Sequence, residues 1–236
     1  QLFTHYAYST CYLLVGVGFL SGSMVKHGLH KRISLGIVSK IGKKPTTLIL
    51  GFIIAVSFVS MWMSNTAATV MMLPVALAIA STKGLRKAMV LCIPYAATIG
   101  GMATVIGTTT NPTGIGLIKE SIGIEIDFLD WLKIGLPFTL VLVPLMWIYM
   151  VKFFKVDKMP SIDISIARKQ YEELGPMKKG EKWTAIVFSF CVVLWVTRSL
   201  VWGDWVPFAT DETVAMLGAF LVMAIPVDYK EGEYVC

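Results

Sequence analysis

The sequence predicts an all-α, polytopic membrane protein that contains a re-entrant helical hairpin and a broken transmembrane helix. Hydrophobic residues make up 56% of the chain, charged residues make up 15%, and the mean hydropathy is +0.70. Several apolar runs approach or exceed the about 20 residues that a helix needs to cross a bilayer. Two of these runs carry polar or glycine residues at mid-length, where a plain span would have none.

Residues 6–25 form the first predicted span, and the basic segment 26–44 follows it. Cytoplasmic loops carry an excess of Lys and Arg, so this span runs from outside to inside. Part of the basic segment has apolar residues at four-residue spacing and polar residues turned away, which is typical of a helix in the membrane interface. A basic loop with chance periodicity is the alternative. The apolar residues are Leu29, Ile33, Ile37 and Ile41, and the polar ones are His30, Lys31, Arg32 and Lys40.

The run 46–81 contains no charged residue, yet its middle is Ser64-Asn65-Thr66. Basic residues flank both of its ends, which places both ends on the cytoplasmic side. Two full spans and a turn need about 44 residues, and this run has 36. We therefore expect a hairpin that turns inside the membrane. Non-helical backbone at that depth survives only against protein or a water-filled cavity, so the turn is predicted to face a site.

The run 88–118 is also uncharged, and it is interrupted at Gly100-Gly101 and at 107–112. We expect a half-helix, an unwound Gly-Thr turn and a second half-helix. Asn111 is a suitable N-cap and Pro112 a suitable first helical residue.

The remaining segments alternate in charge as a multi-pass topology requires. The loop 119–133 has a net charge of −2 and is placed outside. Residues 134–151 cross inward, 152–182 form a cytoplasmic loop with a surface helix over 161–175, 183–202 cross outward, and 213–227 start inward again. A second Ser-Asn-Thr hairpin and a second Gly-Thr turn are absent from the sequence. Since such sites usually come from paired repeats, we expect this chain to be about half of a protein, truncated at both ends.

Both breaks precede a half-helix whose N-terminal N–H groups suit an anion, and both follow a half-helix whose carbonyls suit a hard cation. The runs 45–82 and 88–118 hold no Arg or Lys that could pair with an anion. A bound sodium ion would supply the missing positive charge and leave with the substrate. This pattern favours cation-coupled anion transport.

Ser57, Ser60 and Ser64 share one helical face. We expect Ser57 to bond the carbonyl four residues earlier in its own helix. Ser60, one turn before the break, is assigned to the site. For Asn65 the alternative is a hydrogen bond between helices, and we favour the site.

Other function classes find little support in the sequence. An intramembrane enzyme would need a nucleophile with a base or paired acids, and the buried runs hold no Asp, Glu or His. The four cysteines have no spacing typical of a zinc site. Nine of the 21 basic residues lie in the loops 26–44 and 83–87, which orient the protein and argue against a nucleic-acid partner. A channel with a re-entrant selectivity loop stays open as a rival.

Three segments resemble the divalent-anion/sodium symporter family, the carriers of dicarboxylates, citrate and sulfate. They are GLHKRI (28–33), SNTAATVMMLP (64–74) and ATIGGMATVIGTTTNP (97–112). The resemblance implies an elevator mechanism, in which a scaffold holds a homodimer and a transport domain carries the site across a plasma or bacterial inner membrane. It assigns 1–45 and 183–236 to scaffold and linker, 46–151 to the transport domain and 152–182 to a cytoplasmic loop.

The resemblance also assigns residues to the site. The sodium ligands it implies are Ser60, Ser64, Asn65 and Gly107, with Asn111 as a further candidate. The residues it places on a substrate carboxylate are Ser64, Asn65, Thr66 and Thr108. Thr109 and Thr110 stand where members often have Pro or Gly. The implied substrate is a small dicarboxylate or citrate, with C4-dicarboxylates such as succinate favoured and an exchanger or a sulfate carrier as alternatives. No cofactor is expected besides sodium as the coupling ion.

Overall fold

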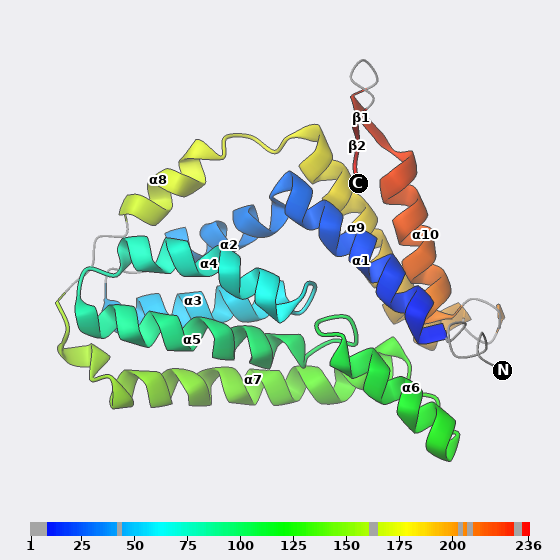
Figure 1. The fold of residues 1–236 in the computed structure, drawn as a ribbon, viewed down its shortest axis with the longest axis horizontal. Coiled ribbons are helices and arrows are strands. Elements are labelled where there is room, and N and C mark those ends of the chain that lie inside the picture. The colour runs from blue at the N-terminus through cyan, green and yellow to red at the C-terminus, as the bar shows by residue number, and fades with distance from the viewer. Residues whose placement is uncertain (1–8, 42–43, 161–164, 203–204, 207–209, 229–232) are drawn as a thin grey trace. The chain divides into compact units, whose positions relative to one another are not determined.

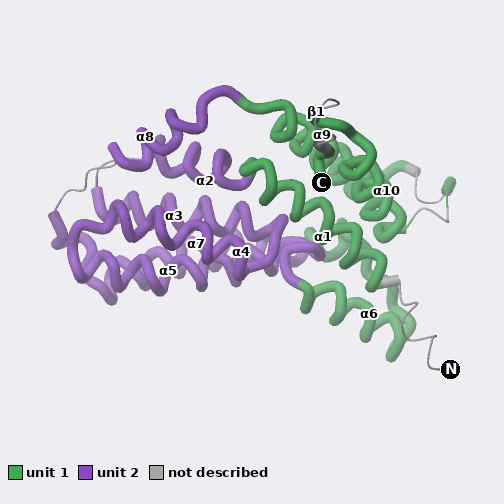
Figure 2. Tube along the Cα trace, turned by 45° about the horizontal axis from the view of Figure 1, so that its top comes forward, with its two compact units in different colours: residues 1–29, 109–133, 177–236 green, residues 30–108, 134–176 purple. Residues whose placement is uncertain are grey.

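The computed structural model describes residues 9–41, 44–160, 165–202, 205–206, 210–228 and 233–236, and their regular structure is mainly helical (Figure 1). The chain divides into two compact units (Figure 2). Unit 1 comprises residues 1–29, 109–133 and 177–236, and unit 2 comprises residues 30–108 and 134–176. The helical character that the sequence predicts is thus present in most of the described part of the chain.

Unit 2 is built around a hairpin of two apolar helices, α3 (Pro45–Ser60) and α4 (Asn65–Ile79). Pro45 takes the first position of α3, where a missing N–H costs no helical bond. Ser64 caps α4, because its Oγ accepts a hydrogen bond of 3.3 Å from Ala67 N. The helices have 16 and 15 residues, fewer than the about 20 of a full span. The predicted helix–turn–helix is present, but its turn is at 61–64, so Asn65 and Thr66 open α4 instead of forming the turn. Its re-entrant path through a membrane stays a prediction.

Helix α5 (Lys83–Gly101) lies against α3, and the two backbones approach closely near Gly100. A Cβ added at Gly100 would lie 2.1 Å from Ser57 O. Because α5 is so near, the Ser57 hydroxyl donates to Ala96 O at 2.9 Å. The expectation that Ser57 bonds a carbonyl of its own helix is therefore wrong: the neighbouring helix offers the acceptor.

The core of unit 2 fills the space among α3, α4 and α5, which run alongside one another in Figure 1. Its largest fully buried side chains come from all three helices, and they are apolar. They include Phe52, Ile53, Met72 and Leu85. This layer of apolar contacts holds the hairpin against α5.

Helix α7 (Phe128–Phe153) enters unit 2 at residue 134 and completes it. The Thr139 hydroxyl donates to Ile99 O of α5 at 3.1 Å. The indole N–H of Trp147 donates to Thr46 O at the start of α3, at 2.9 Å. These two bonds fix both halves of the helix against unit 2, and its outward side chains remain largely apolar and exposed.

Helix α2 (Leu29–Ser39) is the predicted helix of the basic segment, but its buried face extends beyond the expected one. Leu35 and Val38 are fully buried in the core cluster of unit 2. His30 was expected to turn outward, and only 6% of its surface is exposed. The predicted apolar residues Ile33 and Ile37 also pack against this core, and Lys31 and Lys40 are exposed as predicted. The buried face is therefore wider than the four-residue spacing indicates, because contact with the core follows the 3.6-residue helical period.

The cytoplasmic loop carries helix α8 (Ser165–Glu173), which lies within the predicted surface helix. Residues 161–164 of that prediction fall outside the described residues. Arg32 of α2 reaches the segment after α8, where its guanidinium donates to Gly175 O at 2.8 Å and Leu174 O at 3.2 Å. This contact ties α8 to the body of unit 2.

In unit 1, α1 (Ser9–His27) packs with α9 (Lys179–Thr197) and α10 (Asp211–Ala224). The hydroxyls of Ser23 and Thr184 meet at 2.8 Å in its interior. The predicted span 6–25 corresponds to α1, although residues 6–8 lie outside the described ones. By length and composition, α7 and α9 are the helices of the described chain that are apolar enough to cross a membrane.

The C-terminal part of unit 1 holds an unexpected short hairpin, in which β1 (Pro226–Asp228) pairs antiparallel with β2 (Glu233–Tyr234). The start of α10 is tied to α9 by an ion pair of 2.8 Å between Arg198 Nη1 and Asp211 Oδ1. Phe128 N also donates to Asp211 Oδ2, at 2.7 Å. Burial raises the pKa of the Asp211 carboxyl, although the neighbouring guanidinium acts in the opposite sense.

Helix α6 (Thr110–Ile122), also in unit 1, is the second half of the predicted broken helix. Its capping position is occupied by Thr109, so the predicted N-cap at Asn111 is wrong. Pro112 falls in the first turn instead of opening the helix. The first N–H groups of a helix have no helical partner, so proline fits throughout that turn and does not fix its first residue.

The two compact units divide the chain at other points than the predicted scaffold and transport domains. Residues 30–45 and 152–176 belong to unit 2, and residues 109–133 belong to unit 1. Scaffold and transport domains are defined by relative movement, whereas these units are defined by packing. The functional division therefore stays a prediction.

We predict that Gly100→Ala destabilises the protein by about 2–3 kcal/mol, because the added methyl group overlaps backbone that cannot move freely. Thermal unfolding in detergent micelles measures the effect as a lower melting temperature. The control is Gly22→Ala in α1, where an added Cβ meets nothing within 4 Å. It is expected to be neutral or to stabilise by up to about 1 kcal/mol. Equal melting temperatures for the two variants would contradict the close approach of α3 and α5.

Candidate functional site

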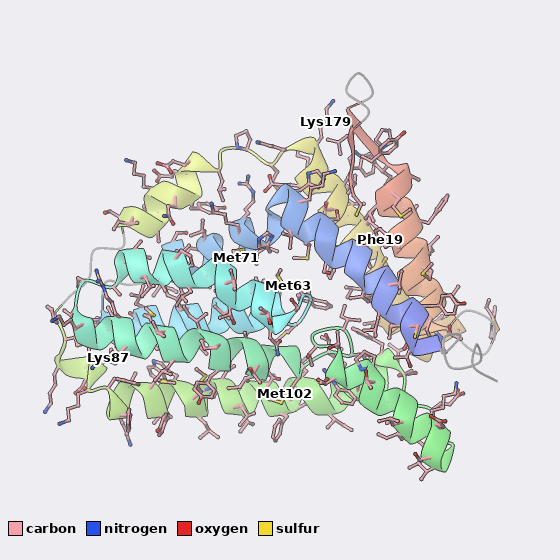
Figure 3. All side chains as sticks on the ribbon, viewed as in Figure 1. Phe19, Met63, Met71, Lys87, Met102 and Lys179 are labelled. Atoms are coloured by element: carbon pink, nitrogen blue, oxygen red, sulfur yellow. The ribbon has the colours of Figure 1, made fainter. Side chains whose placement is uncertain are left out.

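The candidate site lies in unit 2, where α3 ends, α4 begins and α5 reaches its C-terminus. Figure 3 marks this region by Met63, in the turn between α3 and α4, and by Met102, which follows α5. Six of the seven predicted site residues belong to this unit. They are Ser60, Ser64, Asn65, Thr66, Gly107 and Thr108.

Three oxygens lie close together at the fully buried Ser60 side chain: its own Oγ, Ala97 O and Asn65 Oδ1. The Ser60 hydroxyl lies 2.7 Å from Ala97 O of α5 and 2.8 Å from Asn65 Oδ1 of α4. A hydroxyl has one proton and donates to one acceptor at a time. When Ser60 donates to Ala97 O, its own lone pairs and Asn65 Oδ1 remain available to a cation. Neutral oxygens in this arrangement suit a hard ion such as sodium.

Gly101 allows the Asn65 side chain to reach this position. A Cβ at Gly101 would lie 2.2 Å from Asn65 Oδ1, so any other residue here would displace the amide. The segment after α5 then folds back over the helix end: a Cβ at Gly107 would lie 2.5 Å from Gly101 O. Gly107 is buried, and its N–H donates to Thr104 O at 3.4 Å. The predicted Gly107 therefore lies on the same helix end as Asn65.

Thr104 is a residue of this region that the sequence reasoning missed. Its side chain is fully buried, and its hydroxyl donates to Met61 O, the carbonyl at the C-cap of α3. This bond joins the segment after α5 to the end of α3. The sequence offered one signal, a hydroxyl residue inside the apolar run 88–118, but its partner depends on the path of the loop.

The start of α4 presents the polar groups that were assigned to a substrate. Ser64 and Thr66 are exposed, Asn65 is half-buried, and Thr108 is half-buried at the edge of the unit. The first N–H groups of an α-helix have no partner within it and carry partial positive charge. The N-terminus of α4 can therefore accept one carboxylate without a charged side chain.

Asn111 is the predicted site residue that belongs to unit 1. It lies in the first turn of α6, and 7% of its surface is exposed. Its role as a further sodium ligand stays a prediction.

The site is electrically neutral in its side chains. The runs 45–82 and 88–118, which supply it, contain no Asp, Glu, His, Lys or Arg. Within the described residues, no group of three or more His, Cys, Asp or Glu side chains could hold a metal ion such as zinc. Its binding capacity thus rests on carbonyls, hydroxyls, one amide and a helix N-terminus.

An apolar helical hairpin, a broken helix and a neutral oxygen-lined site are together typical of secondary transporters. A family model described as "Citrate transporter" matches residues 1–229, and the chain belongs to this family. The resemblance to divalent-anion/sodium symporters is thereby confirmed.

Curated relatives are similar over almost the whole chain. The "Sodium-dependent dicarboxylate transporter SdcS" of Staphylococcus saprophyticus subsp. saprophyticus is 36% identical over 249 residues. The protein of the same name from Staphylococcus aureus (strain COL) is 32% identical. Each match covers 98% of this chain and 48% of the relative. The chain therefore spans about half the length of the curated relatives it matches.

We predict that Thr104→Val destabilises the protein by about 1–3 kcal/mol, because Met61 O loses the hydrogen bond donated by the buried Thr104 hydroxyl. The substitution keeps the shape of the side chain. The control is Thr98→Val in α5, where an exposed hydroxyl bonds Pro94 O within its own helix, and its effect is expected within about 0.5 kcal/mol. Denaturant unfolding of both variants in micelles gives the comparison, and similar midpoints would argue against the Thr104 link.

Proposed function

We propose that the protein to which this chain belongs is a sodium-coupled secondary transporter of a small dicarboxylate, with C4-dicarboxylates such as succinate favoured. The observation that carries the proposal is the cluster of Ser60 Oγ, Asn65 Oδ1 and Ala97 O beside the N-terminus of α4. A cation site and an anion site adjoin there without a fixed charge. Relatives named sodium-dependent dicarboxylate transporters support both ligands.

The two ligands depend on each other in this arrangement. A dicarboxylate brings negative charge to a region that has no Lys or Arg. Sodium held by the neighbouring oxygens supplies positive charge, so each ligand improves the binding of the other. We assign the ion to Ser60, Ser64, Asn65 and Gly107, and the carboxylate to Ser64, Asn65, Thr66 and Thr108. Once both ligands leave, the site is neutral again and can return empty.

We further propose that the protein is a multi-pass protein of the plasma or bacterial inner membrane and acts as a homodimer with an elevator mechanism. These features rest on the family. The hairpin of two short helices fits a re-entrant path from the cytoplasmic side. Residues 46–151 would then move with the site, and 1–45 with 183–236 would stay with the scaffold.

An exchanger or a sulfate carrier of the same family, and a channel with a re-entrant selectivity loop, are the competing functions. Uptake of radiolabelled succinate into proteoliposomes that contain the natural full-length protein separates them. Saturable uptake that requires an inward sodium gradient supports the symporter. Uptake driven by internal dicarboxylate without sodium supports an exchanger, sulfate uptake without succinate uptake supports the sulfate carrier, and a non-saturating conductance supports the channel.

We predict that Asn65→Ala abolishes sodium-driven succinate uptake, because Asn65 Oδ1 is one of the oxygens assigned to the ion. Initial rates in proteoliposomes with equal amounts of protein measure the loss. The control is Thr69→Ala, about one turn further along α4, whose uptake is expected to match the wild type. Unchanged uptake in Asn65→Ala would remove the proposed sodium site.

We predict that Ser60→Ala raises the sodium concentration for half-maximal uptake about tenfold, which corresponds to about 1.4 kcal/mol of binding free energy. Ser57→Ala is a matched control, because the Ser57 hydroxyl also donates to a carbonyl of α5, that of Ala96. Among the described contacts, Ser57 makes no hydrogen bond to Asn65. Both variants lose a hydroxyl-to-carbonyl bond between α3 and α5. A sodium dependence that shifts equally in both would mean that Ser60 acts through packing.

A further inference from the structure

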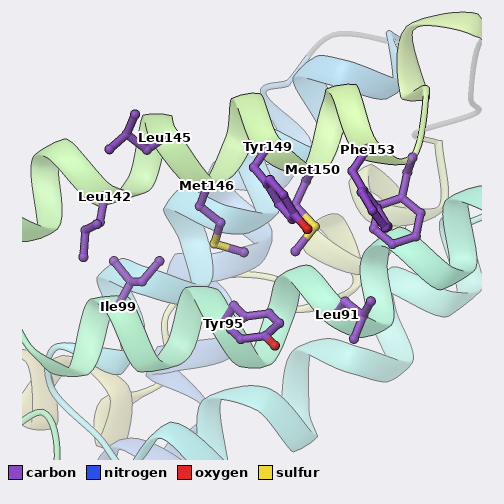
Figure 4. Close-up of a pocket in the computed structure, with 10 residues that line it drawn as sticks. Leu91, Tyr95, Ile99, Leu142, Leu145, Met146, Tyr149, Met150 and Phe153 are labelled. Atoms are coloured by element: carbon purple, nitrogen blue, oxygen red, sulfur yellow. The ribbon is translucent and has the colours of Figure 1, made fainter.

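A groove runs between α5 and α7 on the outer side of unit 2, with a volume of about 510 Å³ (Figure 4). Both helices contribute apolar and aromatic side chains to its walls. Representative ones are Leu91, Tyr95 and Ile99 from α5, and Leu142, Leu145 and Tyr149 from α7. The groove is separate from the residues assigned to sodium and dicarboxylate.

The groove is open to the surroundings of unit 2. Tyr95, Leu145 and Tyr149 are each more than half exposed, at 58%, 55% and 58%. An exposed apolar surface of this extent is unfavourable in water and indicates contact with a membrane or a partner. Since the chain belongs to a family of transporters, hydrocarbon is the expected environment.

The groove continues at one end into a second hollow of about 440 Å³, which shares Leu91, Phe153 and Phe154 with it. Two cationic side chains, Arg86 and Lys87, line this end. Arg86 Nε donates to Ala80 O at 3.0 Å, which positions the guanidinium. Among the described residues, neither cation forms an ion pair with a carboxylate.

The chain segments that border this end add further positive charge. Lys83 opens α5, and Lys152 and Lys155 flank the two phenylalanines at the end of α7. Asp157 is the acidic residue next to them in the described chain. The net charge of this end is therefore positive, and it faces the cytoplasmic side by the charge pattern of the sequence.

The dimensions of the groove fit one leaflet of a bilayer. From Leu91 to Ile99 the helix rises about 12 Å, against about 15 Å for half of the hydrocarbon core. Arg86 lies about 7 Å further toward the helix start, at the depth of lipid headgroups. An amphiphile with an acyl chain in the groove and a negative group at its basic end matches both features.

We propose that the groove between α5 and α7 binds one anionic phospholipid of the cytoplasmic leaflet. One acyl chain lies along Leu91, Tyr95 and Leu145, and the phosphate-containing headgroup lies at Arg86 and Lys87. A phospholipid satisfies both parts of the site at once: its phosphate neutralises the two cations, and its acyl chain covers the apolar groove.

Native mass spectrometry of the natural full-length protein, in an equal mixture of phosphatidylglycerol and phosphatidylcholine, tests the headgroup contact. The variant Arg86→Gln/Lys87→Gln is expected to lose about 30-fold in the ratio of bound phosphatidylglycerol to phosphatidylcholine, from about 1 kcal/mol for each cation. Lys179→Gln/Lys182→Gln removes two exposed cations of α9 and is expected to leave the ratio near that of the wild type. Lys87→Gln alone, which keeps the Arg86 bond to Ala80, is expected to lose about fivefold.

The acyl-chain contact is tested by filling the groove. Leu145→Trp occupies it and is expected to reduce the binding of both lipids. The control Leu140→Trp changes another leucine of α7 that is more than half exposed but does not line the groove. Equal lipid binding in the two tryptophan variants, or equal headgroup ratios in the two double variants, would overturn the proposal and indicate that protein covers the groove. The readout is lipid binding, so its result does not depend on the transport activity proposed above.

Discussion

The arrangement of unit 2 depends on how closely the backbone of α5 approaches α3 and α4. A methyl group at Gly100 or Gly101 would come within 2.2 Å of the neighbouring helix. Because the gap is so narrow, the hydroxyls of Ser57 and Ser60 reach carbonyls of α5. The bond that packs Ser60 against α5 also holds it beside Asn65. Packing and the candidate site therefore have one physical origin.

The hairpin and the broken helix could be predicted because their signals are local. An uncharged run too short for two spans must turn, and three polar residues mark the turn. The structure ends α3 at Ser60 and starts α4 at Asn65, so the turn covers 61–64 and overlaps the predicted triplet at Ser64. The position of Ser60 next to Asn65 also follows from a tight turn. Their roles as sodium ligands rest on the family and stay predictions.

The errors and omissions concern contacts between segments distant in the sequence. The partner of Ser57 is 39 residues away and that of Thr104 is 43 residues away, so neither could be read from local spacing. His30 is buried because α2 packs on a core that the sequence does not place. Asn111 failed as a cap for a different reason, since several residues in a Gly-Thr segment can open a helix equally well.

The positions of the charges give a physical reason for the mobile cation that we propose for this site. The nearest fixed cation of α5 before the site, Lys87, is ten residues from Ala97, or about 15 Å along the helix. It lies at a helix end, where water and salt screen it over about 8 Å. A dicarboxylate at the start of α4 therefore gains little from it. The helix N-terminus supplies about half a charge at most, so a second negative charge has to be balanced by an ion that binds and leaves with the substrate. On this argument the proposed sodium coupling follows from keeping Lys and Arg at the membrane surface.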